Sequence, residues 1–333
     1  METKIDQANC SDITVIMYHY VRDIKKSQYK NIKGLETNCF IEQIKYLNKN
    51  YNIIRMEELI ESVKNNLKLP SKALLLTFDD GYADHFNNVF PVLKEYNIQG
   101  SFYIPAKTVI DHQVLDVNKL HFILASETNF IKIIDDIKKL LCKYKSEFNL
   151  EDFNYYYKKL AIKNRWDDRN IIFIKRLLQV ELNEDLRLLI VDYLFKKYVG
   201  VEESKFAKEL YMNADQIKIM LKSGMHIGCH GYNHYWWNKL SFSDLEQEID
   251  LSLHFLKNLG VDISNWTAAY PYGSYNEEVK ELLDYKKCRL AFSTDLGIAN
   301  NSYKDRLLMK RLDTNDIPVD SNALTNEWFK KSR

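Results

Sequence analysis

The sequence predicts an α/β fold in which parallel strands alternate with helices and a helical block interrupts the pattern. Short apolar runs, each typical of a buried strand, alternate with amphipathic helical segments over most of the chain, as in βα units. Carboxylates or a histidine directly follow some of these runs, at the strand ends where α/β folds place their chemistry. A middle block of roughly a hundred residues shows only helical periodicity.

The composition is that of a soluble globular protein. The chain has 333 residues, of which 46% are hydrophobic and 28% charged, enough for one large α/β domain or two ordinary ones. Lys and Arg (47) nearly balance Asp and Glu (46), so no global charge attracts nucleic acid or an acidic membrane. Nucleic acid is therefore not an expected partner.

The N-terminal segment and the cysteines predict a cytoplasmic location. Residues 1–12 are polar and contain no apolar segment of a signal peptide, and no run of about 18 apolar residues predicts a transmembrane helix. Five cysteines are scattered without CxxC spacing, as expected for reduced cytosolic thiols: Cys10, Cys39, Cys142, Cys229 and Cys288. The sequence does not indicate an oligomeric state.

The first third of the chain predicts four strands and three helices. The apolar runs predict strands over 13–19, 51–54, 74–78 and 100–105. Helical spacing predicts helices over 40–50, 56–66 and 86–96. Pro91 lies inside the last helical pattern, so that helix is expected to be kinked or to begin near the proline.

Residues 107–211 are expected to form a helical insertion between two parts of the α/β domain, 1–106 and 212–333. No glycine occurs between Gly100 and Gly200, and no proline between Pro105 and Pro271. The apolar residues of this block recur at helical spacing, and no strand-length pattern is present.

The βα pattern then resumes. Helices are predicted over 215–223, 242–259 (with Ser241 or Ser243 as N-cap) and 277–285. Strands are predicted over 226–230, 268–270, 290–294 and 309–312.

Two adjacent carboxylates, Asp79 and Asp80, end the buried strand at 74–78. Neighbours in a strand point to opposite sides, so one acid is suited to hold a cation and the other to move a proton. The alternative is an ordinary turn, because Asp-Gly is a common turn dipeptide.

His230 and His234 are four residues apart, which on a helical turn places both imidazoles on one face. Together with one aspartate they form a three-ligand set that leaves room for water on Zn²⁺ or a similar ion. Such an ion activates water, and a second carboxylate beside it can accept the proton.

Three segments, Thr77–Gly81, His230–His234 and Tyr270–Gly273, resemble in order three motifs of the polysaccharide deacetylases, the NodB-homology or carbohydrate esterase 4 family. The resemblance covers about residues 13–105 and 212–316 and leaves the helical block unmatched. It implies an irregular, TIM-like (β/α) barrel with fewer than eight strands.

The resemblance also implies roles for individual residues. Asp79 would be the general base, and Asp80, His230 and His234 the metal ligands. Pro271 and Tyr272 would line the acetyl pocket, with the Tyr272 backbone N–H donating to the oxyanion. The implied cofactor is a divalent metal, zinc first, with Co²⁺, Ni²⁺ or Mn²⁺ as alternatives.

Two departures from the family pattern concern proton transfer. Ala269 occupies the place of an arginine that holds the catalytic aspartate, and Arg311 is a candidate substitute, although arginines are more often on the surface. The general-acid histidine near the C-terminal end is missing. Its candidates are His19, His226, Asp313 or metal-bound water.

Four further residues lie beside the motifs. Trp236 and Trp237 follow the second histidine and are expected either to stack on a sugar ring or to fill the barrel edge. Asp84 and His85 are expected on a helix surface rather than as ligands.

The expected function is metal-dependent removal of an N-acyl group, in the first instance N-acetyl, from an amino sugar that is free, nucleotide-linked or lipid-linked. The alternatives are a deformylase or non-sugar amidase on the same scaffold, and an inactive carbohydrate-binding homologue. The insertion follows a strand, so it is expected on the face of the metal. There it would be a cap that admits small or lipid-linked sugars, or else a dimerisation or solvated arm.

Overall fold

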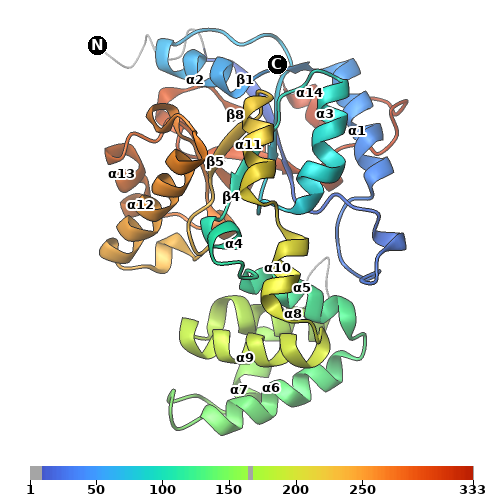
Figure 1. Ribbon diagram of the computed structural model, residues 1–333, viewed down its shortest axis with the longest axis vertical. Helices are drawn as coiled ribbons and strands as arrows, with labels where there is room; N and C mark the ends of the chain where they lie inside the picture. Colours follow the sequence, from blue (N-terminus) through green and yellow to red (C-terminus); the bar gives the residue numbers. More distant parts are fainter. Residues whose placement is uncertain (1–9, 164–167, 333) are drawn as a thin grey trace. The chain divides into compact units, whose positions relative to one another are not determined.

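The computed structural model describes residues 10–163 and 168–332 (Figure 1). The chain divides into two compact units, which are described separately. The barrel unit lies within Met1–Asp23, Gly34–His112 and Ala207–Arg333, and the helical unit comprises Ile24–Lys33 and Gln113–Phe206. The prediction that a signal peptide is absent was based on residues 1–12, and most of this segment lies outside the described residues.

Seven parallel strands among the described residues close into a barrel, which confirms the predicted fold class. They are β1 (Asp12–Tyr18), β3 (Ala73–Phe78), β4 (Ser101–Ile104), β5 (His226–Cys229), β6 (Ala268–Ala269), β7 (Ala291–Leu296) and β9 (Met309–Asp313). Each pairs in parallel with the next, β9 pairs with β1, and β1 closes the barrel on β3 from Ile13↔Ala73 to Tyr18↔Phe78. Two short strands, β2 (Asn52–Ile53) and β8 (Ala299–Asn300), extend the sheet at β3 and β1.

Helices connect the strands and are drawn around them in Figure 1. They are α1 (Thr37–Asn50), α2 (Met56–Asn65), α3 (Phe90–Glu95), α4 (Ala106–Ile110), α11 (Ala214–Lys222), α12 (Phe242–Leu259), α13 (Glu277–Tyr285) and α14 (Glu327–Lys331). The N-cap of α12 is Ser241, whose side chain accepts a hydrogen bond from the Asp244 N–H. A π-helical segment, His85–Val89, leads into α3, so the regular helix begins next to Pro91 as predicted.

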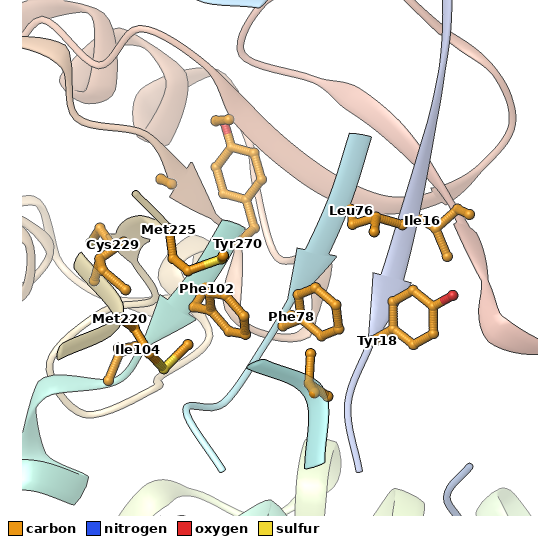
Figure 2. Close-up of a cluster of buried hydrophobic side chains, with 14 of the residues drawn as sticks. Ile16, Tyr18, Leu76, Phe78, Phe102, Ile104, Met220, Met225, Cys229 and Tyr270 are labelled. Atoms are coloured by element: carbon orange, nitrogen blue, oxygen red, sulfur yellow. The ribbon is translucent and has the colours of Figure 1, made fainter. Parts of the chain in front are cut away.

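The strands are buried on both faces, which explains their nearly continuous apolar sequences. Alternate residues of β3 point inward and outward: Leu75 packs inside the barrel, whereas Leu76 and Phe78 pack under the surrounding helices. Figure 2 shows part of the outer layer, in which Phe78 stacks between Tyr18 and Phe102 with centroid distances of 5.0 and 4.7 Å. Phe78 directly precedes Asp79 and Asp80, so this packing fixes the end of β3 from which the two carboxylates project.

The helical unit contains α5 (Asp116–Ser126), α6 (Phe130–Tyr144), α7 (Phe153–Leu160), α8 (Arg169–Arg176), the π-helical segment Leu177–Glu181 and α9 (Glu184–Tyr198). Its described residues contain no strand, in agreement with the predicted helical insertion. The helix α10 (Glu203–Leu210) spans the boundary between the units.

The boundaries of the helical unit differ from the expected 107–211. The segment Ile24–Lys33 belongs to this unit, because the Tyr29 ring packs against Phe122 and Phe206 at centroid distances of 4.8 and 5.9 Å. The start of α4 stays with the barrel unit, because the Ala106 N–H donates to the carbonyl oxygen of Gly231. Contacts between segments that are distant in the sequence set these boundaries, and the hydrophobic periodicity of the sequence contains no information about such contacts.

All five cysteines are free in the structure. Within residues 10–163 and 168–332, no helix has the length and apolar character needed to cross a membrane.

Candidate metal centre

The acid pair lies where the chain leaves β3. The Asp79 N–H donates to the carbonyl oxygen of Tyr18, so Asp79 continues the pairing with β1. Asp80 and Gly81 then adopt left-handed backbone conformations, with φ of 73° and 67°. A Cβ at Gly81 would lie 3.0 Å from the Cγ2 of Ile104, so the left-handed φ and the close side chain together favour glycine here. The strained turn separates the two carboxylates and gives each its own surroundings.

The two histidines lie on a loop after β5, not on a helical turn, so that part of the prediction was wrong. Gly231 and His234 have φ of 75° and 63°, which no helix permits, and the loop folds both imidazoles toward Asp80. The buried carboxylate of Glu248 on α12 holds this loop, because it accepts hydrogen bonds from the backbone N–H and side-chain amide of Asn233 at 2.6 and 2.9 Å.

Asp80, His230 and His234 converge in one buried cluster. Their potential ligand atoms all lie within 4.8 Å of one another, and the Nε2 atoms of the two histidines are 3.3 and 3.4 Å from Asp80 Oδ1. The Nδ1–H of His230 donates to the carbonyl oxygen of Ala269 at 2.7 Å, which leaves its Nε2 for a ligand. Two imidazoles and one carboxylate suit a divalent metal ion and leave positions open for water or substrate.

Asp79 pairs with Arg311, which reaches it from β9. Arg311 Nη1 is 2.9 Å from Asp79 Oδ1, and Nη2 is 2.7 Å from Oδ2, so the contact is bidentate. The guanidinium is 1% exposed and also donates to the Thr77 hydroxyl and to the carbonyl oxygen of Ser293. Arg311 thus makes the contact with Asp79 that was expected of an arginine at position 269, where this sequence has alanine.

The surroundings of each group set its protonation. Burial raises the pKa of Asp79, but the charges of Arg311 and His230 and the bond to Arg311 outweigh it and hold that pKa below the ordinary value. Burial likewise raises the pKa of Asp80, yet the histidines around it hold it well below the usual range. Burial, and then the charge of His230, lower the pKa of His234 to about 3. Both carboxylates are therefore ionised at neutral pH.

Tyr82 is a member of the centre that the sequence did not single out. Its hydroxyl donates to Asp80 Oδ2, on the carboxylate oxygen that does not face the histidines. Its ring stacks on Tyr20 with a centroid distance of 4.1 Å and on Tyr211 at 6.0 Å. Burial and the charge of Asp80 hold the pKa of Tyr82 well above its ordinary value, so the hydroxyl remains a donor. Its position directly after Gly81 was the available signal.

The segment 271–273 follows β6 beside the histidines. Tyr272 has a φ of 57°, and its ring lies 4.7 Å from the ring of His234. Trp236 stacks on Tyr272 almost in parallel, at 4.4 Å and 5°. Trp237 is fully buried against Tyr270 and fills the core. The adjacent tryptophans therefore have different surroundings, with only Trp236 stacked on the segment beside the ligands.

The structure separates the three candidates for the general acid. His226 begins β5, whereas the metal ligands follow the ends of their strands, so His226 lies at the opposite end of the barrel. Its Nε2 is 2.8 Å from the Thr267 hydroxyl, and burial lowers its pKa to about 4. Asp313 caps the turn after β9 and accepts from the Asn315 N–H. His226 is therefore not placed to protonate a leaving group at the centre, whereas Asp313 ends β9 on the side of the metal ligands.

His19 follows the end of β1 and is half-buried. The pairing of Tyr18 with Phe78 and the bond from the Asp79 N–H to the Tyr18 carbonyl oxygen place His19 beside the acid pair. The expected surface position of His85 was wrong, because His85 is fully buried and its Nε2–H donates to the His19 carbonyl oxygen at 2.9 Å. Asp84 is mostly buried as well and pairs with Arg22 at 2.6 Å.

The barrel carries a buried Asp–His–His cluster suited to a divalent metal ion, and comparison with known proteins identifies the family. The polysaccharide deacetylase family model matches residues 66–135 and 193–291, about half of the chain. The chain therefore belongs to the polysaccharide deacetylase family, whose members hydrolyse carbon–nitrogen bonds. The buried cluster is typical of the divalent metal site of this family.

Two curated relatives match short parts of the chain. The poly-beta-1,6-N-acetyl-D-glucosamine N-deacetylase of Escherichia coli is 33% identical over 82 residues, which are 24% of this chain and 12% of that protein. The putative polysaccharide deacetylase YxkH of Bacillus subtilis is 26% identical over 98 residues, 29% of this chain and 33% of that protein. The chain thus spans a third or less of the length of these relatives.

Solved structures show the same fold over most of the chain. The Streptococcus pyogenes deacetylase PplD in complex with acetate has a TM-score of 0.56 and 17% identity, covering 91% of this chain and 92% of that chain. IcaB from Ammonifex degensii has a TM-score of 0.53 and 19% identity, covering 91% of both chains.

Proposed function

We propose that this chain is a metal-dependent N-deacetylase that hydrolyses the acetamide of an N-acetylated amino sugar or glycan precursor. The buried cluster of Asp80, His230 and His234, with the Asp79–Arg311 pair beside it, carries the proposal. The names of the relatives support it, since the Escherichia coli protein is named for deacetylation of an N-acetylglucosamine polymer and the Streptococcus structure holds acetate. The substrate is proposed to be a free, nucleotide-linked or lipid-linked amino sugar.

We propose zinc as the cofactor, held by one carboxylate and two imidazoles. A cation bound there supplies Lewis-acid chemistry, lowering the pKa of water and polarising the scissile carbonyl. His230 is oriented for this role by its bond to the Ala269 carbonyl, and Asp80 by its bond from Tyr82.

Asp79 is the proposed general base, accepting a proton from the attacking water. Arg311 fixes the orientation of the carboxylate and keeps it ionised at neutral pH. The Tyr272 backbone N–H is the proposed donor to the oxyanion of the tetrahedral intermediate, and Pro271 is proposed to line the acetyl pocket.

His19 is the proposed general acid for the leaving amine. It is half-buried, follows Tyr18 at the end of β1 beside the acid pair, and has its backbone held by the bond from His85. His226 is set aside because it begins β5, at the opposite end of the barrel, and bonds to Thr267. Asp313, at the end of β9, is the alternative.

The test is acetate release from a panel of N-acetylated amino sugars by zinc-loaded protein, with Asp79→Asn as the variant. We expect Asp79→Asn to retain the metal and to lose turnover by about a thousandfold, the size of a general-base contribution. Asp215→Asn, a change of one exposed carboxylate on α11 in the same unit, is the matched control. Bound metal without acyl release, unchanged by Asp79→Asn, would favour an inactive binding protein.

The panel also tests the enzyme alternatives. Formate release from N-formyl compounds, without acetate release, would favour a deformylase, and cleavage of non-sugar amides alone would favour an amidase.

The cap expected of the insertion stays a prediction, to be tested by deleting residues 112–208 and measuring turnover of a small N-acetyl sugar. We also propose a cytoplasmic location, which the five free cysteines support and which cell fractionation would test.

A further inference from the structure

The loop that carries His19, residues 19–22, is held by the helical segment that follows the acid pair. Three side chains of this segment bond to three residues of the loop: Asp84 to Arg22 at 2.6 Å, His85 to His19 at 2.9 Å and Asn88 to Val21 at 2.8 Å. Residues 85–89 form a π-helical turn, and such turns are rare and often lie at functional sites. A helix that begins just after the two carboxylates thus fixes the loop at the end of β1.

His85 is fully buried, and its ring has several aromatic neighbours. The ring centroids of Phe78 and Phe102, two members of the layer in Figure 2, lie 5.6 and 5.7 Å away, and that of Tyr82 lies 5.5 Å away. A phenylalanine would suit these surroundings, because it has no polar atom to bury. The packing therefore does not explain why an imidazole occupies this position.

The two nitrogens of His85 explain it. A carbonyl oxygen has no proton to give, so Nε2 is the donor in the bond to the His19 carbonyl oxygen. Nδ1 is buried and has no hydrogen-bond partner among residues 10–163 and 168–332. The bond to His19 is therefore what the imidazole provides and a phenylalanine would not.

Three successive carbonyl oxygens of the chain around His19 accept hydrogen bonds. Their donors are, in order, the Asp79 N–H for Tyr18, the His85 ring for His19 and the Leu35 N–H for Tyr20. The first and third bonds come from the backbone, so they do not depend on the side chain at position 85. The peptide plane that follows His19 is thus held by a side chain, that of His85.

We propose that His85 is a positioning residue for His19, because its hold on the His19 carbonyl sets the direction from which the His19 imidazole reaches the leaving amine. The inference rests on the proposed deacetylase function, with His19 as the general acid. When the C–N bond of the acetamide breaks, its electron pair goes to the nitrogen, which takes a proton from His19. A displaced acid slows this step, whereas the attack of water depends on Asp79.

The test compares two substrates that differ in their leaving group. An amine needs a proton in order to leave, whereas the phenolate of 4-nitrophenyl acetate leaves without one. His85→Phe keeps the aromatic packing and removes the donor, so kcat for the N-acetyl sugar that the parent turns over fastest should fall at least about tenfold. The KM for that sugar and the turnover of 4-nitrophenyl acetate should stay within about twofold of the parent values.

Three further variants serve as references. His85→Gln places an amide N–H as many bonds from Cα as the Nε2–H of histidine, so it should restore most of the lost kcat. His19→Ala should show the same pattern on the two substrates, and adding His85→Phe to it should lower kcat little further, because the two residues act together. The matched control is His226→Phe, which removes the bond of another histidine at the opposite end of the barrel and should leave both activities unchanged.

Thermal unfolding should show that the variants are folded, and His85→Leu, which also lacks a donor, replaces His85→Phe if that variant does not fold. The positioning role is overturned if the variant without a donor slows both substrates equally, or if His85→Gln is no more active than that variant. It is also overturned if amide turnover falls in His19→Ala alone, in which case the proposed function stands. A parent protein that releases no acetate from any N-acetyl sugar would overturn the proposed function, and this inference with it.

Discussion

The barrel unit and the helical unit both bury charged side chains, but they pair them differently. In the helical unit, Lys119 is 4% exposed and contacts the carboxylates of Asp192 and Glu203. Asp136 is 6% exposed and pairs with Lys197, while the Tyr198 hydroxyl donates to it. Each of these buried charges is paired with an opposite charge, because an unpaired buried charge would destabilise the fold.

In the barrel unit, the buried carboxylate of Asp79 pairs with an arginine, whereas the adjacent carboxylate of Asp80 has no Lys or Arg partner among the described residues. Asp79 is matched by Arg311, whereas Asp80 faces two imidazoles and a tyrosine hydroxyl. Among the described residues, no Lys or Arg pairs with Asp80. A buried carboxylate surrounded by neutral donors and imidazoles is a place for an added cation. The difference in partners singles out Asp80 as the carboxylate of the pair that suits a bound cation.

The largest expected effect comes from the ligands. Asp80→Ala removes the anionic ligand, so metal affinity should fall by roughly a hundredfold or more, with loss of acetate release. Elemental analysis after dialysis and the acetate assay measure the two effects. Asp136→Ala, which removes a buried carboxylate of the helical unit, should keep both metal and activity. Equal metal loss in both variants would contradict the distinction between the units.

The next effect concerns Arg311→Met. Arg311 lowers the pKa of Asp79, and burial, which raises it, would then dominate. A general base must be ionised, so the acidic limb of the kcat/KM profile should move to higher pH, and turnover at neutral pH should fall by about a hundredfold.

Arg311→Lys is the control for this prediction, because it retains the positive charge and should recover part of the profile. Circular dichroism must show a folded protein, since Asp79 is left buried without its partner. An unshifted acidic limb in folded Arg311→Met would mean that Arg311 does not set the ionisation of the base.

A smaller effect is expected for Tyr82→Phe. The change removes the hydrogen bond to Asp80 Oδ2 and leaves the ring stacked on Tyr20, so zinc affinity should fall by about 10- to 100-fold. Competition with a chromophoric chelator measures this directly. Tyr211→Phe is the control, because it alters a tyrosine stacked on Tyr82 and keeps the Tyr82 hydroxyl and its bond to Asp80. If both variants bind zinc like the parent protein, Tyr82 has a packing role alone.

The smallest expected effect is Lys119→Met in the helical unit. It should reduce the free energy of unfolding by about 1–3 kcal/mol and leave zinc affinity unchanged. Burial lowers the pKa of Lys119, but the bond to Asp192 and the charge of Glu203 outweigh it and raise that pKa above 10.5.

The pH dependence of this variant follows from that direction. A raised folded-state pKa gives a stabilisation that is complete below the unfolded value of 10.5 and is lost as the pH rises through the folded value. Chemical denaturation should therefore show a constant difference between variant and parent at neutral pH, which shrinks only under strongly alkaline conditions. A difference that varied between pH 6 and 9 would contradict this assignment.

Much of the fold could be predicted from local patterns. Helix α12 has the expected bounds of 242–259, and the buried strands begin and end within one or two residues of the apolar runs. These elements depend on spacing, caps and breakers that lie within a few residues of one another. The surroundings of His85 could not be predicted in this way, because its partner is the backbone of His19 on another strand end.

The sequence by itself determined the parallel βα pattern and the metal-ligand candidates, because motifs at strand ends report which groups share the carboxyl-terminal face. Its resemblance to the polysaccharide deacetylases added the barrel. Only the tertiary structure decided which arginine accompanies Asp79, since Arg311 is 232 residues away and lies inside the barrel through the closure of β9 on β1. It likewise decided that a left-handed loop, held by Glu248, brings the histidines together. Such contacts depend on how the chain closes in space, and no local spacing encodes them.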